Sequence, residues 1–158
     1  MGRPWILDYD GANCTIGAAV GIIGEKWTFL VLREVFNGVR RFDDMQRRTR
    51  APRQVLSDRL ARLVGHGLLR KAPYQEHGQR SRQEYRLTEA GLDLYPVMVA
   101  LMQWGDRHAA DPAGPLALLT HRDCGEPVRL GLTCAAGHRL ASAREVTPLP
   151  GPGARKIA

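Results

Sequence analysis

The sequence predicts a mainly α-helical domain with one small β-hairpin, an α+β class, followed by a short β-rich appendage. Apolar residues recur at helical spacing through most of the first 107 residues, and two strand-like runs flank a polar turn at 75–82. Proline and glycine mark a linker at 111–115. At 158 residues, 44% of them hydrophobic, the chain can bury one main core plus a small appendage.

The net charge of +7 and the isoelectric point near 9.9 favour an anionic partner. Most of the excess is arginine, which binds phosphate and bases with directional hydrogen bonds. The longest apolar run, 15–24, is too short to span a bilayer, and Asp8 and Asp10 interrupt any signal-peptide pattern. We therefore expect a cytoplasmic protein without membrane contact. Three cysteines do not indicate a disulfide framework.

Composition and periodicity divide the chain into four expected segments. These are an N-terminal arm at 1–11, a main domain at 12–110, a small β-rich appendage at 111–147 and a flexible tail at 148–158. The arm carries apolar residues without a period. An arm of this kind packs on a partner subunit or frays.

The main domain should begin with two helices. Asn13 is a suitable N-cap for a helix over 14–23, where Gly17 and Gly21 lie one turn apart and permit a close helix contact. That contact would serve a core or a subunit interface equally well. Gly24 ends this helix, and 25–36 should form the next. Arg41 and Phe42 suffice only for a minimal strand, after which a short helix should run from Asp43 to about Arg48.

The stretch 47–67 is the centre of the prediction. Leu56, Leu60, Leu63 and Val64 occupy one face of a helix that must enter a core. Pro52 suits its first position, and glycines at 65 and 67 suit its end.

The outward residues of this helix and its approach carry base-reading chemistry. Arginine can bind the edge of guanine, glutamine can bind adenine, and serine can bind a base or a phosphate. Residues of these types could therefore read a major groove. The residues are Arg50, Arg53, Gln54 and Ser57. From residue 41 to residue 62 there are seven Arg against three Asp. A solvated helix face would explain the charge alone, but the flanking sequence favours DNA.

Strand-like runs at 68–74 and 83–88 predict a hairpin with a polar, basic tip, which is a wing beside the predicted recognition helix. Arg80 and Arg82 in this wing are suited to the phosphate backbone or a minor groove. Helices and wing together predict a winged helix-turn-helix fold.

A long helix should run from Thr88 to about Arg107, bent at Pro96. It is apolar nearly all round, more than one small domain can cover, so we expect a dimer helix. A core helix of a single chain is the alternative.

In the appendage, short strands are expected at 116–120, 128–134 and 140–147. Two pairs, His121 with Cys124 and Cys134 with His138, resemble zinc-ligand spacing. A degenerate or lost metal site is the favoured interpretation, and a structural zinc site is the alternative. We therefore predict no bound metal and no cofactor.

The motifs in this order resemble the HxlR family of bacterial winged-helix regulators over residues 12–107. They are Cys14, Gly24-Glu25-Lys26-Trp27, Leu32-Arg33, Gly38, Arg41-Phe42, Val55-Leu56-Ser57-Asp58-Arg59-Leu60, Gly67-Leu68-Leu69, Pro73-Tyr74 and Tyr85-Arg86-Leu87-Thr88-Glu89-Ala90-Gly91. The resemblance implies a homodimeric transcription regulator that binds double-stranded DNA, with recognition helices in successive major grooves of an inverted-repeat operator. It also implies dimerisation through the first and last helices.

Several members of that family sense electrophiles or oxidants through an N-terminal cysteine, and Cys14 falls at that position. A thiol near a helix N-terminus gains thiolate character, which fits such redox sensing, although a buried cysteine that only packs is the alternative. A two-cysteine switch would need a second thiol in the winged-helix core, and the other cysteines lie at 124 and 134.

The sequence therefore predicts a sequence-specific DNA-binding transcription regulator, with a small-molecule or electrophile effector as an option. The alternative is a winged-helix protein-interaction module that uses its C-terminal tail to bind a partner or structural zinc. An enzyme is not expected, because the sequence has no glycine-rich phosphate loop, nucleophile elbow or paired acidic motif. His66, His77 and His108 are isolated.

Overall fold

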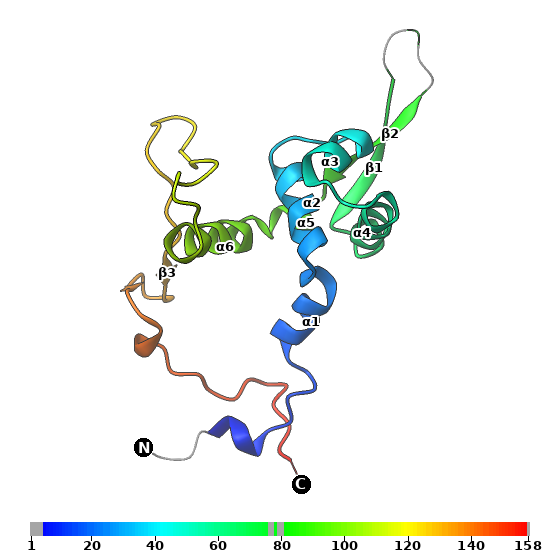
Figure 1. Ribbon diagram of the computed structural model, residues 1–158. Helices are drawn as coiled ribbons and strands as arrows, with labels where there is room; N and C mark the ends of the chain where they lie inside the picture. Colours follow the sequence, from blue (N-terminus) through cyan, green and yellow to red (C-terminus); the bar gives the residue numbers. More distant parts are fainter. Residues whose placement is uncertain (1–4, 76–77, 79–80, 158) are drawn as a thin grey trace. The chain divides into compact units, whose positions relative to one another are not determined.

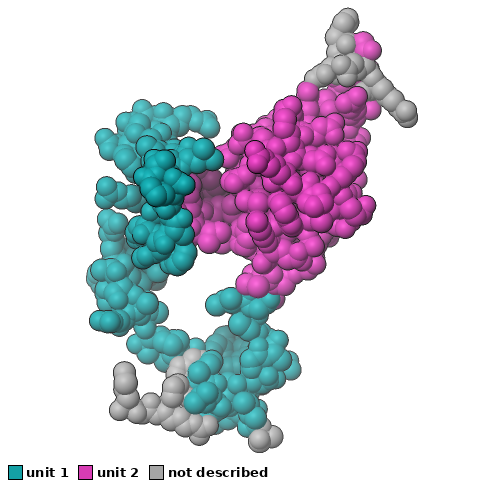
Figure 2. All heavy atoms as spheres, in the orientation of Figure 1, with its two compact units in different colours: residues 1–17, 103–158 teal, residues 18–102 magenta. Residues whose placement is uncertain are grey.

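The computed structural model describes residues 5–75, 78 and 81–157. The chain divides into two compact units, residues 18–102 and residues 1–17 together with 103–158 (Figure 2). The unit of residues 18–102 holds the helices and hairpin of the main domain (Figure 1). Its elements, including the two helices that cross its limits, are α1 (Thr15–Ile23), α2 (Lys26–Phe36), α3 (Phe42–Thr49), α4 (Arg53–Gly65), β1 (Leu69–Tyr74), β2 (Arg82–Leu87), α5 (Glu89–Leu92) and α6 (Tyr95–His108).

The core of this unit forms around α2, which contacts α3, α4 and β2. The apolar side of α4 is buried as its periodicity predicts, because Leu56, Leu60 and Leu63 are completely inaccessible to solvent. Val31 and Leu32 of α2 are buried with them. Full burial of a leucine side chain contributes roughly 1.5–3 kcal/mol, so these contacts dominate the stability of the unit.

The predicted wing is confirmed. β1 and β2 are antiparallel, with Leu69 opposite Leu87 near the helices and Tyr74 opposite Arg82 near the tip. Leu69 and Ala72 of β1 and Glu84 of β2 are buried, and the other residues of both strands are exposed or partly exposed. Three helices and a hairpin in this order form a winged helix-turn-helix, the predicted fold class.

The predicted minimal strand at Arg41 and Phe42 is wrong, because Phe42 is already the first residue of α3. The edge of the wing instead pairs one residue earlier, where the amide of Tyr85 donates to the carbonyl of Arg40 at 2.8 Å. One hydrogen bond of this kind does not make a strand, and the residues that follow Arg41 belong to helix α3.

The start of α1 also differs from the prediction. The helix begins at Thr15, and the Asn13 side chain donates to the carbonyl of Gly153 at 2.6 Å instead of capping the helix. Cys14 caps the helix in place of Asn13, because its sulfur accepts a hydrogen bond from the amide of Gly17 at 3.4 Å.

The single bent helix predicted after Thr88 is two helices, α5 and α6. Thr88 is the N-cap of α5, since its hydroxyl accepts from the amide of Gly91 at 3.1 Å. The helix stops at Leu92, four residues before Pro96, because the proline ring would collide with the Leu92 carbonyl and cannot donate to it. Pro96 is then the second residue of α6, where no amide hydrogen is required.

The second unit is stabilised mainly by backbone pairing. It contains η1 (Trp5–Asp8), β3 (Leu132–Thr133), β4 (Arg139–Leu140) and η2 (Ala143–Glu145). The predicted strand at 116–120 is reduced to one bridge between Thr120 and Pro127, and that at 140–147 is mostly wrong, since η2 occupies its centre. The arm and tail predicted at the termini pair with each other, as the amide of Asp10 donates to the carbonyl of Arg155 at 2.8 Å.

Among the described residues, no single helix is long and apolar enough to cross a membrane. Taken together, α1 and α2 meet that criterion of length and composition, as a pair bent by 77°.

Candidate nucleic-acid interface

The exposed face of α4 carries three of the predicted DNA-contacting residues. Arg53, Gln54 and Ser57 lie in the first turns of the helix and are exposed, while Leu56 and Leu60 on the opposite side are buried. Helical geometry therefore directs the three polar side chains away from the core as one group. The structure brings them together as the sequence predicts.

Arg50 occupies the turn between α3 and α4. It is the C-cap of α3, its φ of 57° is left-handed, and its amide donates to the carbonyl of Gln46 at 2.8 Å. An arginine in this conformation costs about 1 kcal/mol, which glycine or asparagine would avoid. The exposed side chain thus stands at the corner of the helix-turn-helix, beside the first turn of α4.

Arg53 and Gln54 have protein contacts that DNA would compete with. The Arg53 guanidinium lies 4.8 Å from the centre of the Phe42 ring and 3.8 Å from the Asp43 carboxylate. Both charged side chains are more than two-thirds exposed, so this ion pair is weak. The Gln54 amide donates to Asp58 at 2.8 Å. These contacts orient both side chains and can be exchanged for base edges at low cost.

Other arginines of the basic stretch stabilise the fold instead. Arg59 pairs with Glu25 at 2.6 Å, and the guanidinium of Arg62 donates to the carbonyl of Gly21. Both contacts join α4 to the chain around the α1–α2 turn. The charge counted from sequence therefore overstates the number of cations available to a ligand.

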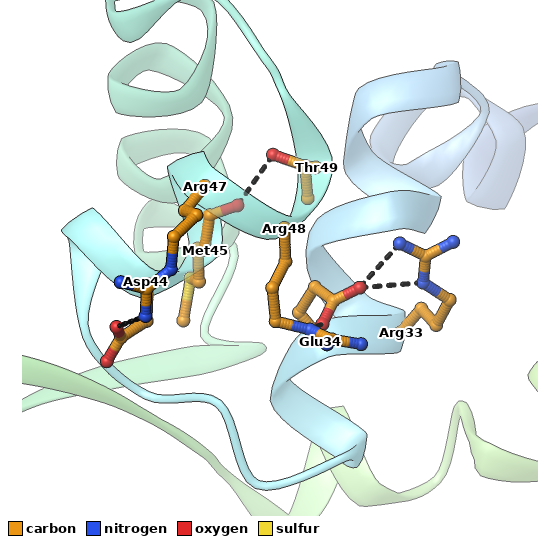
Figure 3. Close-up of polar contacts among 7 residues, drawn as sticks. All are labelled: Arg33, Glu34, Asp44, Met45, Arg47, Arg48 and Thr49. Atoms are coloured by element: carbon orange, nitrogen blue, oxygen red, sulfur yellow. Dashed lines mark hydrogen bonds and ion pairs between the residues drawn. The ribbon is translucent and has the colours of Figure 1, made fainter.

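A buried carboxylate holds α3 against α2 (Figure 3). Glu34 of α2 is completely buried, and its two carboxylate oxygens accept from different arginines. Arg33 donates to Oε1, with its Nε at 2.9 Å, and Arg48 of α3 donates to Oε2. Burial alone would raise the pKa of Glu34, but the hydrogen bonds and charges of Arg48 and Arg33 outweigh it and lower that pKa.

Sequence reasoning missed Glu34, although a signal was present. The residue lies four positions after Leu30 and three after Val31, within the apolar stripe of α2. A charge on such a stripe requires a buried partner, and here the partner fixes the first helix of the helix-turn-helix.

The wing contributes Arg82, an exposed residue at the start of β2. A surface depression lies between this strand and the start of α3, lined in part by Arg41, Asp43, Tyr74 and Arg82. Arg41 stacks over the Tyr74 ring at 4.5 Å. Basic groups of the wing and of α3 thus border one depression. The predicted wing residue Arg80 lies outside the described residues.

Cys14 is exposed immediately before α1. Its sulfur accepts from the Gly17 amide, and its own amide donates to the carbonyl of Gly11 at 3.1 Å. The sulfur therefore acts as an N-cap acceptor. It binds one of the first amides of α1, which have no partner within the helix.

The two Cys–His pairs of the appendage are each brought together. His121 Nδ1 lies 3.3 Å from the Cys124 sulfur, and His138 Nδ1 lies 3.5 Å from the Cys134 sulfur. Within the described part of the chain, no three His, Cys, Asp or Glu residues form a group able to hold a metal ion.

Comparison with known proteins agrees with this architecture. The HxlR-like helix-turn-helix family matches residues 22–112, a range that excludes Cys14 and most of the appendage. The chain is 48% identical over 139 residues to the uncharacterized HTH-type transcriptional regulator Rv3095 of Mycobacterium tuberculosis, covering 88% of this chain and 87% of that one.

Two solved structures are also similar. PA1607, a candidate transcription factor, is 33% identical with a TM-score of 0.78, over 89% of this chain and 96% of its own. PA1374 of Pseudomonas aeruginosa, also a candidate transcription factor, is 34% identical with a TM-score of 0.60, over 90% and 95%. Given the winged fold and the family match over more than half its length, the chain belongs to the HxlR-like helix-turn-helix family of DNA-binding transcriptional regulators, which are not enzymes.

Proposed function

We propose that the protein regulates transcription as a homodimer on an inverted-repeat operator, with α4 of each subunit in a major groove and the wing on the adjacent backbone. The observation that carries this proposal is the exposed group of Arg53, Gln54 and Ser57 on a helix whose other side is fully buried. Arg50 and Arg82 supply further positive charge for phosphates. Arg80 is included in the proposal from the sequence, as a second arginine of the wing.

The dimer is supported by apolar side chains that a single chain leaves in water. Ile16 of α1 is 73% exposed and Trp104 of α6 is 55% exposed, and Val20, Val97 and Leu101 on the same helices are also exposed. Surfaces of this kind are typical of subunit interfaces. Because a two-fold dimer presents two identical helices, its half-sites should lie one helical turn, ~34–36 Å, apart.

The test is binding of the purified protein to DNA from upstream of its own gene, measured by fluorescence anisotropy at several salt concentrations. Neutralising Z phosphates makes log K fall against log salt with a slope of about −0.9Z, so we expect steep salt dependence for two subunits. Binding to a scrambled duplex should be weaker. Equal affinity for both duplexes, or no binding, would favour the protein-interaction module.

Arg53→Ala examines the base contacts directly. We expect a loss of ~1–3 kcal/mol on the operator and weaker discrimination at one base pair, because an arginine fork binds one guanine. Arg129→Ala, an exposed charge of the appendage, is the matched control and should leave affinity unchanged. A uniform loss for Arg53→Ala on every duplex would make Arg53 a phosphate contact.

We further propose that thiol-reactive electrophiles or oxidants regulate this binding through Cys14. The Cys14 sulfur is exposed and accepts a hydrogen bond from the Gly17 amide at the start of α1, so a reagent in solution can reach it. Alkylation at the start of α1 would add bulk to a helix assigned to the dimer. Cys14→Ser should retain operator affinity and lose any response to a quinone. A Cys14→Ser protein that still releases DNA on treatment would exclude Cys14 as the sensor.

A further inference from the structure

We propose that Phe42 and Asp43 of α3 are positioning residues for Arg53, which direct its guanidinium to a guanine and disfavour a phosphate. The proposal rests on the function proposed above, because it explains how one of the base contacts of α4 becomes selective. Neither α3 residue has to touch DNA for this role. Both act through contacts that hold the far end of the Arg53 side chain and set the charge around it.

The backbone of Arg53 is fixed, whereas its side chain is long and exposed. Arg53 is the first residue of α4 and follows Pro52, whose ring restricts φ and whose φ is −54°. Leu56, three residues later, is completely buried and holds this end of the helix in the core. The Arg53 side chain is 72% exposed, so the position of its guanidinium depends on the contacts at its far end.

Phe42 supports this guanidinium with its ring. The guanidinium carbon of Arg53 lies 4.8 Å from the ring centre, and Phe42 is partly buried against the hydrophobic core. The chain just before Phe42 is attached to the wing, because the Tyr85 amide donates to the Arg40 carbonyl at 2.8 Å. A guanidinium that stacks on an aromatic ring keeps its N–H edges for other acceptors. The ring therefore restricts the arginine without occupying its donors.

Asp43 approaches the same guanidinium from one edge. Its Oδ1 lies 3.8 Å from Arg53 Nη1, which is an ion pair but is longer than a hydrogen bond. The contact therefore uses none of the five N–H donors of the guanidinium. A guanine accepts two of them, at O6 and N7. Hence Arg53 can bind a guanine while Asp43 stays beside it.

The Asp43 carboxylate distinguishes acceptors by their charge. The O6 and N7 atoms of guanine are uncharged acceptors, whereas a phosphate oxygen is part of an anion. A carboxylate beside the guanidinium repels a second anion and has much less effect on a neutral base edge. Asp43 therefore disfavours binding of Arg53 to a phosphate, the contact that every DNA sequence offers. Binding to a guanine keeps most of its strength, so the preference for guanine rises.

The size of the effect follows from the exposure of the pair. The Asp43 side chain is 77% exposed, so water and salt screen its charge. Exposed ion pairs couple weakly, and we expect about a threefold change in selectivity for each subunit. Two subunits act at distant half-sites, so their effects multiply to about tenfold in a dimer.

Asp44 offers a matched control in the same turn of α3. It carries the same charge, but its carboxylate pairs with Arg47 at 2.6 Å, one turn along the same helix. Asp43→Asn and Asp44→Asn each remove one carboxylate and release one exposed arginine. Both variants should therefore bind a scrambled duplex more tightly. Only Asp43→Asn should change the preference for a base pair.

The test uses operator duplexes selected from a random library with the full-length, unaltered protein. Fluorescence anisotropy then measures affinity for duplexes in which one base pair is replaced in both half-sites. Arg53→Ala identifies the base pair that Arg53 reads, because its loss is confined to that position. There, Asp43→Asn should lower the preference for guanine by about tenfold, whereas Asp44→Asn should keep it. Phe42→Leu should lower the same preference, and Phe42→Tyr, which retains the ring, should keep it.

An unchanged guanine preference in Asp43→Asn would overturn the proposal, as would an equal loss at every base pair in Asp43→Asn or Arg53→Ala. A further loss when Asp43→Asn is added to Arg53→Ala would also overturn it, because Asp43 would then contact a base itself. Circular dichroism before each titration establishes that the variants are folded. If the unaltered protein discriminates bases and Asp43→Asn changes nothing, this inference alone fails. If the unaltered protein binds operator and scrambled DNA equally, the proposed function fails as well.

Discussion

Arg48→Ala should destabilise the helix-turn-helix far more than Arg47→Ala, although both remove one positive charge from the same helix. Arg48 donates to Oε2 of the buried Glu34, whereas Arg47 pairs at 2.6 Å with Asp44 on the surface (Figure 3). Glu34 is completely buried, while the Arg47 side chain is 78% exposed. Comparing the two variants therefore separates the effect of losing a partner of a buried carboxylate from the effect of losing one positive charge.

The magnitude follows from what each variant leaves behind. Removing one partner of a buried ion pair costs roughly 3–5 kcal/mol when the remaining charge is stranded. Here Arg33 still holds Oε1, and the Arg48 side chain is 49% exposed, so water can reach part of the vacated space. We therefore expect about 2 kcal/mol for Arg48→Ala. Arg47→Ala should cost at most about 0.5 kcal/mol, the value of a surface pair one turn apart.

Urea denaturation followed by circular dichroism, at one fixed protein concentration, measures this difference. With a slope of about 2 kcal/mol/M, the midpoint of Arg48→Ala should fall by about 1 M and that of Arg47→Ala by less than about 0.3 M. Operator affinity of the folded Arg48→Ala protein should also fall, because α3 loses its ion pair with Glu34 of α2. Equal midpoints for the two variants would refute the assigned role of the buried carboxylate.

The pH dependence gives an independent check. Because the folded protein lowers the pKa of Glu34, its ionisation stabilises the fold at pH values above the pKa of the unfolded chain. That contribution is lost as the pH falls through the lowered value. The gap in stability between the unaltered protein and Arg48→Ala should therefore be full near neutral pH and shrink in acid. A gap that is constant from about pH 7 to about pH 3 would contradict the sign of this linkage.

Three further outcomes are expected. Gly91→Ala should destabilise the protein by about 2 kcal/mol or more, because an added Cβ would overlap the backbone carbonyl of Leu68; a thermal melt with an unchanged midpoint would contradict this contact. Thr88→Ala should cost about 1 kcal/mol through loss of the α5 cap, measured by the same melt, whereas Thr88→Ser should retain most of it. Arg82→Ala should weaken binding to every duplex and reduce the salt slope by about two, about one for each subunit of the dimer, and a slope unchanged in anisotropy titrations would remove Arg82 from the interface.

The elements that the sequence predicts correctly are those whose signal is local. The burial of Leu56, Leu60 and Leu63 follows from helical spacing alone, and glycine and proline mark the limits of α4. The wing follows from two strand-like runs around a polar turn. The outward position of Arg53 and Gln54 is a consequence of the same periodicity, so most of the candidate interface was accessible from the chain itself.

Where the prediction fails, one cause is local and the other is a contact between distant residues. The break between α5 and α6 depends on a clash between Pro96 and the carbonyl of Leu92, and the pattern located the bend at the proline instead of one turn earlier. Asn13 is a good cap by type, yet it bonds Gly153, and Cys14 accepts the helix amide instead. Propensity is a weak prior, which a long-range hydrogen bond easily overrides.

By itself the sequence determined the fold class, the helix α4, the wing and the family, because each depends on periodicity, turn residues or the order of motifs. Only the tertiary structure decided which arginines are bound closely to buried, backbone or carboxylate acceptors and which keep a mostly exposed side chain. Arg48, Arg59 and Arg62 are indistinguishable from Arg53 in a count of charges, but they pair with Glu34, Glu25 and the carbonyl of Gly21. The physical reason is that an arginine's role depends on which acceptor packing brings within reach, and packing joins residues far apart in the chain.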